Sequence, residues 1–94
     1  MATLHIEHAI SDFAVWTSAF GRFEDVRQKA GVRGQRVRRP VDDEHYVVID
    51  LDFDTADEAT AMLELLRTRV WSSSAASPAL VGPANARVLE TVEV

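Results

Sequence analysis

The sequence predicts an α+β fold with its elements in the order β-α-β-β-α-β, and three observations lead to this prediction. Four short segments are expected to be strands, most clearly where apolar and polar residues alternate. Two longer segments carry apolar residues at steps of three and four, as amphipathic helices do. Each helical segment has a single apolar stripe, so two helices are expected on one face of a four-stranded antiparallel sheet.

The composition is that of a small globular domain, and it excludes several kinds of function. Residues 1–94 fit a single domain, and 47% of them are apolar. The chain has no cysteine, which excludes disulfides, thiolate catalysis and cysteine-ligated metal sites. Its net charge of −5 argues against nucleic acid as the main partner. A core of this size is thin, so a homodimer would be a natural way to bury more apolar surface.

Nothing in the sequence predicts a membrane or secreted location. No apolar run approaches the roughly 20 residues needed to span a bilayer. The first residues, MATLHIEHAI, have neither the basic start nor the long apolar stretch of a signal peptide. We therefore expect a cytoplasmic protein without a membrane partner.

The first strand is expected over residues 3–10, TLHIEHAI, because apolar and polar residues alternate there. One face of this strand is markedly more apolar and carries Leu4, Ile6, His8 and Ile10. The other face carries Thr3, His5, Glu7 and Ala9. Ser11 or Asp12 follows at the position of a helix N-cap, so the strand should lead directly into the first helix.

The first helix is expected to run for about five turns, over residues 13–30. Its apolar stripe consists of Phe13, Trp16, Ala19, Phe20, Phe23, Val26 and Ala30. Gly31 follows as the expected C′ residue, where glycine adopts the left-handed conformation at least cost. Gly21, in the middle of the helix, should cost about 1 kcal/mol relative to alanine.

Two strands are expected in the middle of the chain. Residues 32–40 form a weak, basic strand that ends at Pro40, and arginines on both of its faces favour an edge position. Residues 45–53, HYVVIDLDF, form the strongest strand of the chain. The apolar face of that strand carries Val47, Ile49, Leu51 and Phe53.

The second helix begins with a capping box, in which Thr55 is the N-cap and Glu58 is at position N3. Its apolar positions are Ala59, Met62, Leu63, Leu66 and Val70. A loop of small residues, 72–83, then leads to a last strand over residues 86–94. With the first and third strands central, this order is the ferredoxin-like split β-α-β arrangement.

Two motifs resemble metal sites without meeting the requirements of one. Residues three apart on a strand point to opposite faces, so His5 and His8 of H-x-x-H cannot readily share a metal. The D-x-D-x-D motif at Asp50 begins like a calcium loop but lacks glycine at position six and glutamate at position twelve. We therefore expect no metal and interpret the aspartates as part of an ion-pair network formed by Asp50, Asp52, Arg36 and Arg38.

Three segments make the chain resemble a known group of proteins. HAISDFAVWTSAF connects the first strand to the first helix, GVRGQRVRRPVDDEHYVVIDLDFDTADEA spans the second and third strands, and VGP precedes the last strand. With this element order and length, the chain resembles the dimeric α+β barrel superfamily, in particular the small proteins grouped with antibiotic biosynthesis monooxygenases. The resemblance covers essentially the whole chain. It implies a homodimer whose two sheets face each other, with a ligand pocket between each subunit's sheet and helices.

His8 is the candidate for a catalytic group. It interrupts the apolar face of the first strand, and a buried imidazole needs a hydrogen-bond partner. Two interpretations stay open: a core histidine bonded to a carbonyl or carboxylate, or an acid–base or substrate-orienting group that lines a pocket. In several oxygenases that the chain resembles, an asparagine at this strand position is paired with a tryptophan near the end of the second helix. Trp71 has that tryptophan's position here.

Trp16 and Trp71 are the candidate substrate-binding residues. Trp16 lies on the apolar stripe of the first helix, either as a core residue or as a pocket wall. Trp71 follows the second helix beside the small-residue loop, either as a pocket wall or as a packed cap. Aromatic walls with one or two polar groups are what a site for a flat aromatic ligand requires.

Two functions are therefore open. The first is a small homodimeric enzyme, a monooxygenase or cyclase-like protein without a cofactor, which acts on an aromatic or polyketide-type compound. The alternative is a non-catalytic binding or structural homodimer with a filled core, and the lack of a cavity of roughly 300 Å³ would favour it. Haem degradation, another activity in the superfamily, ranks low because no histidine follows His45 to serve as an axial ligand.

Overall fold

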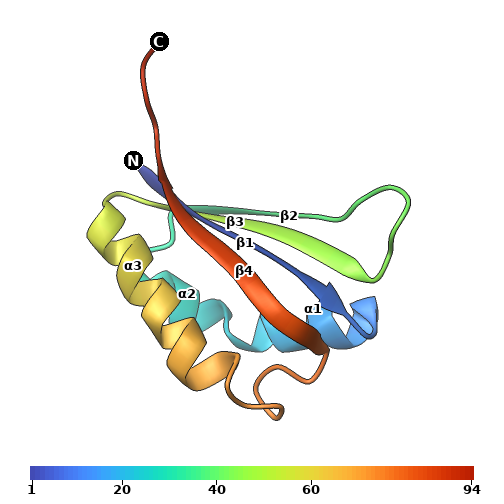
Figure 1. Cartoon of the computed structure of the whole chain (residues 1–94). Coiled ribbons are helices and arrows are strands. Elements are labelled where there is room, and N and C mark those ends of the chain that lie inside the picture. The colour runs from blue at the N-terminus through green and yellow to red at the C-terminus, as the bar shows by residue number, and fades with distance from the viewer.

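A computed structural model of residues 1–94 shows a four-stranded antiparallel sheet with helices on one face (Figure 1). The strands are β1 (Ala2–Ile10), β2 (Gly34–Arg38), β3 (Tyr46–Phe53) and β4 (Leu80–Glu90). The helices are α1 (Phe13–Arg22), α2 (Glu24–Ala30) and α3 (Ala56–Leu65), which continues into a π-helical turn, η1 (Leu66–Val70). The sheet order is β2-β3-β1-β4, so the first and third strands are central and β2 is an edge strand. The predicted ferredoxin-like α+β fold is confirmed.

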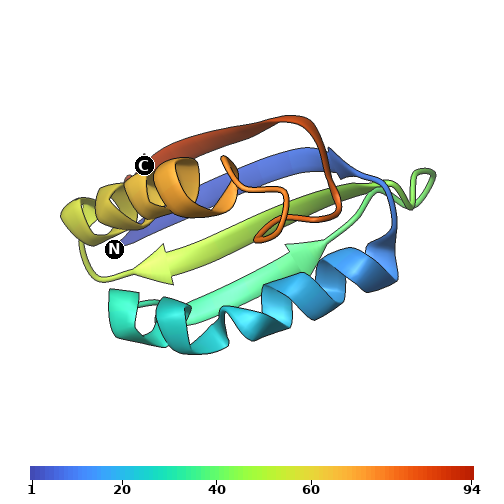
Figure 2. The same ribbon diagram turned by 90° about the horizontal axis from the view of Figure 1, so that it is seen from below.

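The core lies between the sheet and the helices. Figure 2 shows α1 and α2 end to end on the β2 side and α3 on the β4 side, all on the same face of the sheet. The inner face of the sheet contributes buried residues at every second position: Ala2, Leu4, Ile6 and Ile10 of β1, and Val47, Ile49, Leu51 and Phe53 of β3. Each large apolar side chain buried in this way stabilises the fold by about 1.5–3 kcal/mol. None of the helices is long and apolar enough to cross a membrane.

The predicted first helix is divided into two. Phe23 leaves the helical conformation (φ −100°, ψ 14°) and separates α1 from α2. Its backbone N–H donates to the carbonyl oxygen of Phe20, three residues back, at 3.2 Å. The same carbonyl accepts a second bond of 2.6 Å from the Arg27 guanidinium Nη1. Because that carbonyl bonds to a side chain and to Phe23, it is not used in a continuous α-helical ladder.

The predicted helix ends are present. Asp12 is the N-cap of α1, and its carboxylate accepts the backbone N–H of Val15 at 2.9 Å. Thr55 caps α3 by accepting the N–H of Glu58 at 3.2 Å. Gly31 follows α2 in the left-handed conformation, with φ of 100°. These local signals are correctly predicted because each depends on neighbouring residues alone.

We expect alanine substitution at the two glycines near α2 to change stability in opposite directions. Gly31→Ala should destabilise by about 1–2 kcal/mol, because a left-handed residue with a Cβ is strained. Gly21→Ala, the matched control, should stabilise by up to about 1 kcal/mol, because nothing lies within 4 Å of an added Cβ. Urea unfolding of the two variants measures both changes. Equal changes in the free energy of unfolding at the two positions would contradict the special requirement for glycine at residue 31.

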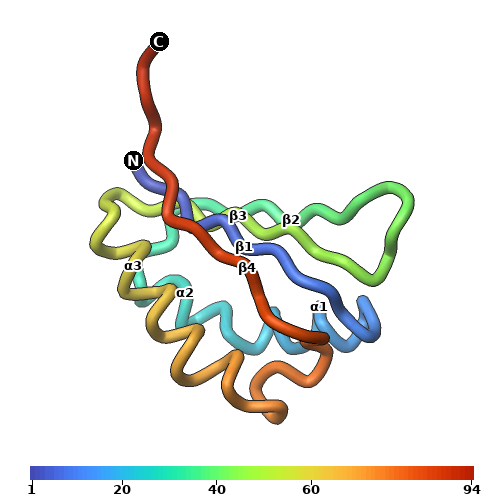
Figure 3. Tube along the Cα trace, in the orientation of Figure 1, coloured from blue at the N-terminus to red at the C-terminus, as the bar shows by residue number.

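The last strand begins and ends earlier than predicted. β4 begins at Leu80 rather than at residue 86, so it includes Gly82 and Pro83, which resemble turn residues in the sequence. It ends at Glu90, and residues 91–94 extend beyond the sheet next to the N-terminus (Figure 3). The tail is connected to the N-terminus by a bond of 3.4 Å from the Thr91 N–H to the Met1 carbonyl.

Candidate functional site

A small apolar cavity lies between the sheet and the helices. β1 and β3 form its floor, α1 and α2 form one wall, and α3, η1 and residues 76–80 form the other. Apolar side chains make up nearly all of the lining, and no aspartate or glutamate is among them. The polar side chains that line it, apart from the two tryptophans, are those of His8, Arg27 and Ser77. All three predicted site residues, His8, Trp16 and Trp71, line this one cavity.

The free volume of the cavity is about 80 Å³. Two or three water molecules would fill this space, at roughly 30 Å³ each. Ligand pockets usually measure at least about 300 Å³, so the cavity is too small for a polycyclic ligand unless part of its wall moves. The volume therefore favours the filled-core alternative more than a wide open pocket.

His8 is buried, with 4% of its surface exposed. Its Nδ1 lies 3.0 Å from the carbonyl oxygen of Ala9. Because a carbonyl oxygen only accepts, Nδ1 carries the proton and donates it, which leaves Nε2 of the neutral ring as the acceptor. Nε2 has no partner within the chain. Burial lowers the pKa of His8 more than its bond to Ala9 raises it, so the ring is neutral at pH 7 with a free basic nitrogen.

A β-bulge lies at the position of His8. Glu7 is paired with Asn85 of β4, but Ala9 is paired with Val81, so β4 has residues 82–84 where β1 has His8 alone. Gly82 permits the bulge because its φ is 69°, in the left-handed region. Bulges redirect side chains and are frequent beside functional sites. The sequence signal for this bulge is the glycine–proline pair that precedes the predicted last strand.

Trp16 contributes both to the core and to the cavity wall. Its side chain is largely buried, and its ring is stacked between those of Phe13, at 6.1 Å, and Phe20, at 4.8 Å. These three rings form a continuous aromatic row along α1. Trp16 and Phe20 of this row line the cavity, so they form its aromatic wall on the α1 side.

Trp71 lies at the end of the π-helical turn. Its backbone N–H donates to the Leu66 carbonyl oxygen, five residues back, at 2.7 Å, which is the bond that defines this turn. Its ring is half-buried and lines the cavity opposite α1. The following loop is held by Ser77, whose hydroxyl lies 2.9 Å from the Val70 carbonyl and 2.8 Å from that of Ser73. π-helical turns of this kind often occur at functional sites.

Arg27 is the lining residue that the sequence analysis did not single out. It lies in α2 with 4% of its surface exposed. Burial lowers its pKa, and the nearby carboxylate of Glu24 partly opposes that shift. A signal was present, because residue 27 continues the three- and four-residue spacing of Trp16, Phe20 and Phe23. A charged residue at a stripe position is a candidate for a buried polar group.

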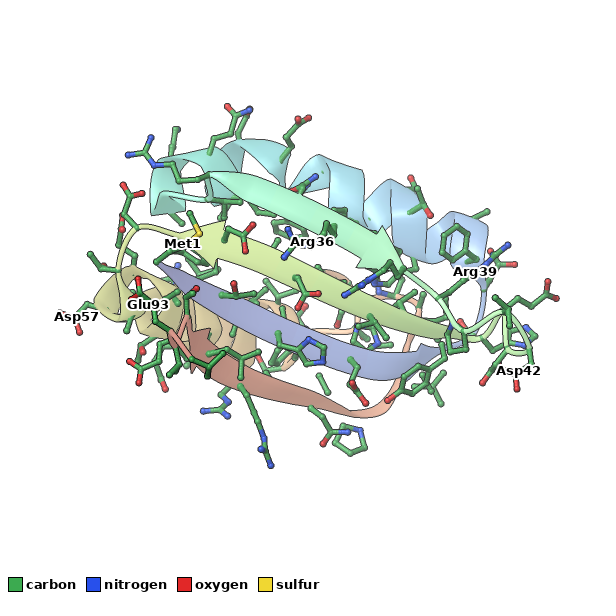
Figure 4. The ribbon with its side chains drawn as sticks, turned by 90° about the horizontal axis from the view of Figure 1, so that it is seen from above. Met1, Arg36, Arg39, Asp42, Asp57 and Glu93 are labelled. Atoms are coloured by element: carbon green, nitrogen blue, oxygen red, sulfur yellow. The ribbon has the colours of Figure 1, made fainter.

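The opposite face of the sheet has no helix over it, and we call it the open face (Figure 4). A chain of hydrogen bonds runs across it. His5 Nδ1 lies 2.7 Å from Asp50 and Nε2 lies 3.0 Å from Glu7. Tyr46 donates to Glu7 at 2.9 Å, and Arg38 donates to Asp50 at 2.6 Å. The bonds to Glu7 and then to Asp50 raise the pKa of His5.

The predicted ion pairs are present on the open face. Arg36, labelled in Figure 4, reaches from β2 to Asp52 at 3.0 Å, and Arg38 pairs with Asp50. His5 and His8 lie on opposite faces of the sheet, as predicted. The structure contains no cluster of three or more metal-ligating side chains.

The fold and the cavity together define a ferredoxin-like α+β protein with an apolar site on the helical face of its sheet. No family model matches the sequence, and no curated protein sequence matches it. The structure is similar to the solved "Putative antibiotic biosynthesis monooxygenase from Nitrosomonas europaea", with a TM-score of 0.72, 12% identity, and coverage of 99% of this chain and 100% of that one.

Two further solved structures are similar over nearly their whole length. A protein of the same description from Bordetella bronchiseptica has a TM-score of 0.69 and 12% identity, over 98% of both chains. A dimeric ferredoxin-like protein from an uncultured marine organism has a TM-score of 0.61 and 8% identity, over 100% of this chain and 97% of that one. At such identities the similarity establishes the fold, and it agrees with the resemblance found in the sequence.

Proposed function

We propose that the protein is a cytoplasmic homodimeric enzyme, a cofactor-independent monooxygenase or cyclase-like protein that acts on a small aromatic or polyketide-type compound. The single observation that carries the proposal is His8, a neutral imidazole with a free Nε2 in a cavity with aromatic walls. Such a nitrogen can accept the proton of a phenol or enol. Trp16 and Trp71 would contact the flat face of the substrate.

The chemistry of the proposed step follows from the loss of one proton. The O–H bond of the substrate breaks, its proton forms a new N–H bond at His8 Nε2, and the electron pair stays on the substrate oxygen. The resulting phenolate or enolate is electron-rich. In an oxygenation, dioxygen adds one oxygen atom to a ring carbon, and the other leaves as water with the proton from His8 and the ring proton, while the substrate supplies both electrons and becomes a quinone. In a cyclisation, the enolate carbon forms a bond to a carbonyl carbon, and the resulting alkoxide takes the proton back from His8.

The open face supports the homodimer in this proposal. It combines the polar chain around His5 with exposed apolar residues on β4, Val81 and Leu89, which are 48% and 44% exposed. Asp50 is only 5% exposed although no helix covers this face. A mixed surface of this kind suits a second sheet packed against it, and a similar fold is described as dimeric.

The alternative function is a non-catalytic binding or structural homodimer, and the volume of about 80 Å³ favours it. In that case the large aromatic side chains simply fill the core. The two functions differ in what happens when ligands are added. An enzyme must open the wall at Trp71 and the following loop, whereas a filled core must stay closed.

A thermal-shift screen with polycyclic phenols, lactones and haem tests the proposal, followed by oxygen uptake with any compound that binds. A ligand of the folded state should raise the melting temperature by mass action. Ala76→Phe, which places a ring into the cavity from the loop, should remove the shift. The absence of any shift with the wild-type protein would instead support the filled core.

A further inference from the structure

Arg27 carries a buried positive charge that no carboxylate neutralises. No Asp or Glu oxygen lies within 4.0 Å of its guanidinium, whereas Arg33, Arg36, Arg38 and Arg67 each have such a partner. Glu24, one helical turn earlier, acts on it only from a longer distance. Buried charges are usually paired, so an unpaired one requires an explanation.

The contacts of Arg27 within the chain leave one side of the guanidinium free. Nε donates to the Gln35 side chain at 3.0 Å, and Nη1 donates to the Phe20 carbonyl at 2.6 Å. The guanidinium carbon lies 3.7 Å from the centre of the Phe20 ring. Nη2 makes no hydrogen bond within the chain and is accessible to water. It is a free donor on a side chain that lines both the cavity and a neighbouring polar depression, which Glu24 and Arg33 also line.

The rest of the cavity strengthens the effect of this charge. No acidic residue lines it, and His8 is neutral, so Arg27 is the single formal charge of the site. In a mostly apolar cavity a charge acts through a low dielectric, and its attraction for an anion is stronger than at the surface. A planar guanidinium also matches the geometry of a carboxylate or an ionised phenol.

We infer that the cavity selects ligands with an anionic oxygen, an aromatic carboxylate or an ionised phenol, and that Arg27 binds that oxygen. This inference rests on the proposed function, because it assumes that the cavity takes a ligand. It goes beyond the proposed function by predicting that the ligand is negatively charged, which neither the fold nor His8 determines. Arg27 is here a specificity-determining residue. Its hydrogen bonds to the Phe20 carbonyl and the Gln35 side chain hold the guanidinium in place.

Benzoate and benzamide test the inference, because they have nearly the same shape and differ in charge. Isothermal titration should show benzoate binding at least about tenfold more tightly than benzamide to the wild-type protein. Arg27→Gln should bring the two affinities together, and Arg27→Lys should keep part of the difference. Arg33→Gln is the matched control, because Arg33 is an exposed arginine between α2 and β2 that pairs with Asp54 and does not line the cavity.

The outcomes separate this inference from the proposed function. Equal or tighter binding of benzamide to the wild-type protein would overturn the role of Arg27, while the ligand cavity itself would stand. Binding of neither probe, nor of 1-naphthol, would overturn both. The comparison in the wild-type protein needs no substitution, so it remains decisive even where Arg27→Gln fails to fold.

Discussion

Replacement of His8 by glutamine is expected to lower turnover by about 10²–10⁴-fold, because the substituted side chain cannot accept a proton. Glutamine keeps a polar group of similar reach, so the fold and the proposed dimer should be retained. Single-turnover measurements with a substrate from the ligand screen give the size of the effect. Far-UV circular dichroism and size-exclusion chromatography check that the variant is folded.

The pH dependence of this reaction has a definite sign. Burial holds the pKa of His8 below its ordinary value of 6.5. The ring is therefore mostly in its neutral, basic form at pH 6.5 and above. The rate should fall only as the pH drops through the lowered pKa and the ring becomes protonated. Activity that falls with a midpoint above 6.5 would contradict this assignment.

A second variant, His8→Asn, distinguishes proton transfer from simple orientation of the substrate. Asparagine stands at this strand position in the oxygenases that the sequence resembles. If His8 only orients the substrate by a hydrogen bond, asparagine should retain most of the rate. If His8 accepts the proton, asparagine should be as inactive as glutamine. An unchanged rate in both variants would remove His8 from the mechanism.

The order of the elements and the capped ends of the helices follow from local sequence signals, whereas the ends of the last strand and the break in the first helix do not. Asp12 and Thr55 cap helices through neighbouring backbone groups, so the sequence is sufficient to predict them. The break at Phe23 is accompanied by a bond from the Arg27 guanidinium to the Phe20 carbonyl, and Arg27 also bonds to Gln35 of β2. No local pattern predicts it.

The candidate site was predictable in part for the same reason. Strand alternation places His8 on the helical face, and its partner there, the Ala9 carbonyl, is a neighbour in sequence. The bulge that isolates His8 depends on the pairing of β1 with β4. Arg27 was missed because surface charge is the usual role of arginine, although its position on the apolar stripe indicated otherwise. The cavity volume depends on how side chains of seven elements pack, which periodicity does not describe.

Replacement of Asp50 by asparagine is expected to destabilise the protein by about 1–3 kcal/mol at pH 6, the largest effect that we predict on the open face. Asp50 is 5% exposed and accepts bonds from both His5 and Arg38. Asparagine keeps the shape but removes the negative charge between two donors. Urea unfolding at a fixed protein concentration measures the loss, since the proposed dimer makes stability depend on concentration.

The loss should depend on pH in the direction that His5 sets. Glu7 and Asp50 raise the pKa of His5 above its ordinary value of 6.5. The stabilisation from protonated His5 is therefore fully present below pH 6.5 and is lost as the pH rises through the raised pKa. His8 acts in the other direction, because its lowered pKa gives a stabilisation that is present above pH 6.5 and is lost on acidification. The difference between wild type and Asp50→Asn should thus be largest near pH 6 and smaller in alkali.

Asp54→Asn is the matched control for this experiment. Asp54 also accepts bonds from an arginine, Arg33, but its side chain is 56% exposed and no histidine contacts it. Exposed pairs contribute little, so this variant should stay within about 1 kcal/mol of wild type, with no change in its pH profile. A loss at Asp50 that is no larger than at Asp54, or that grows in alkali, would show that the chain of bonds around His5 does not stabilise the open face. The proposed pairing of this face with a second sheet would then have to rest on its apolar residues alone.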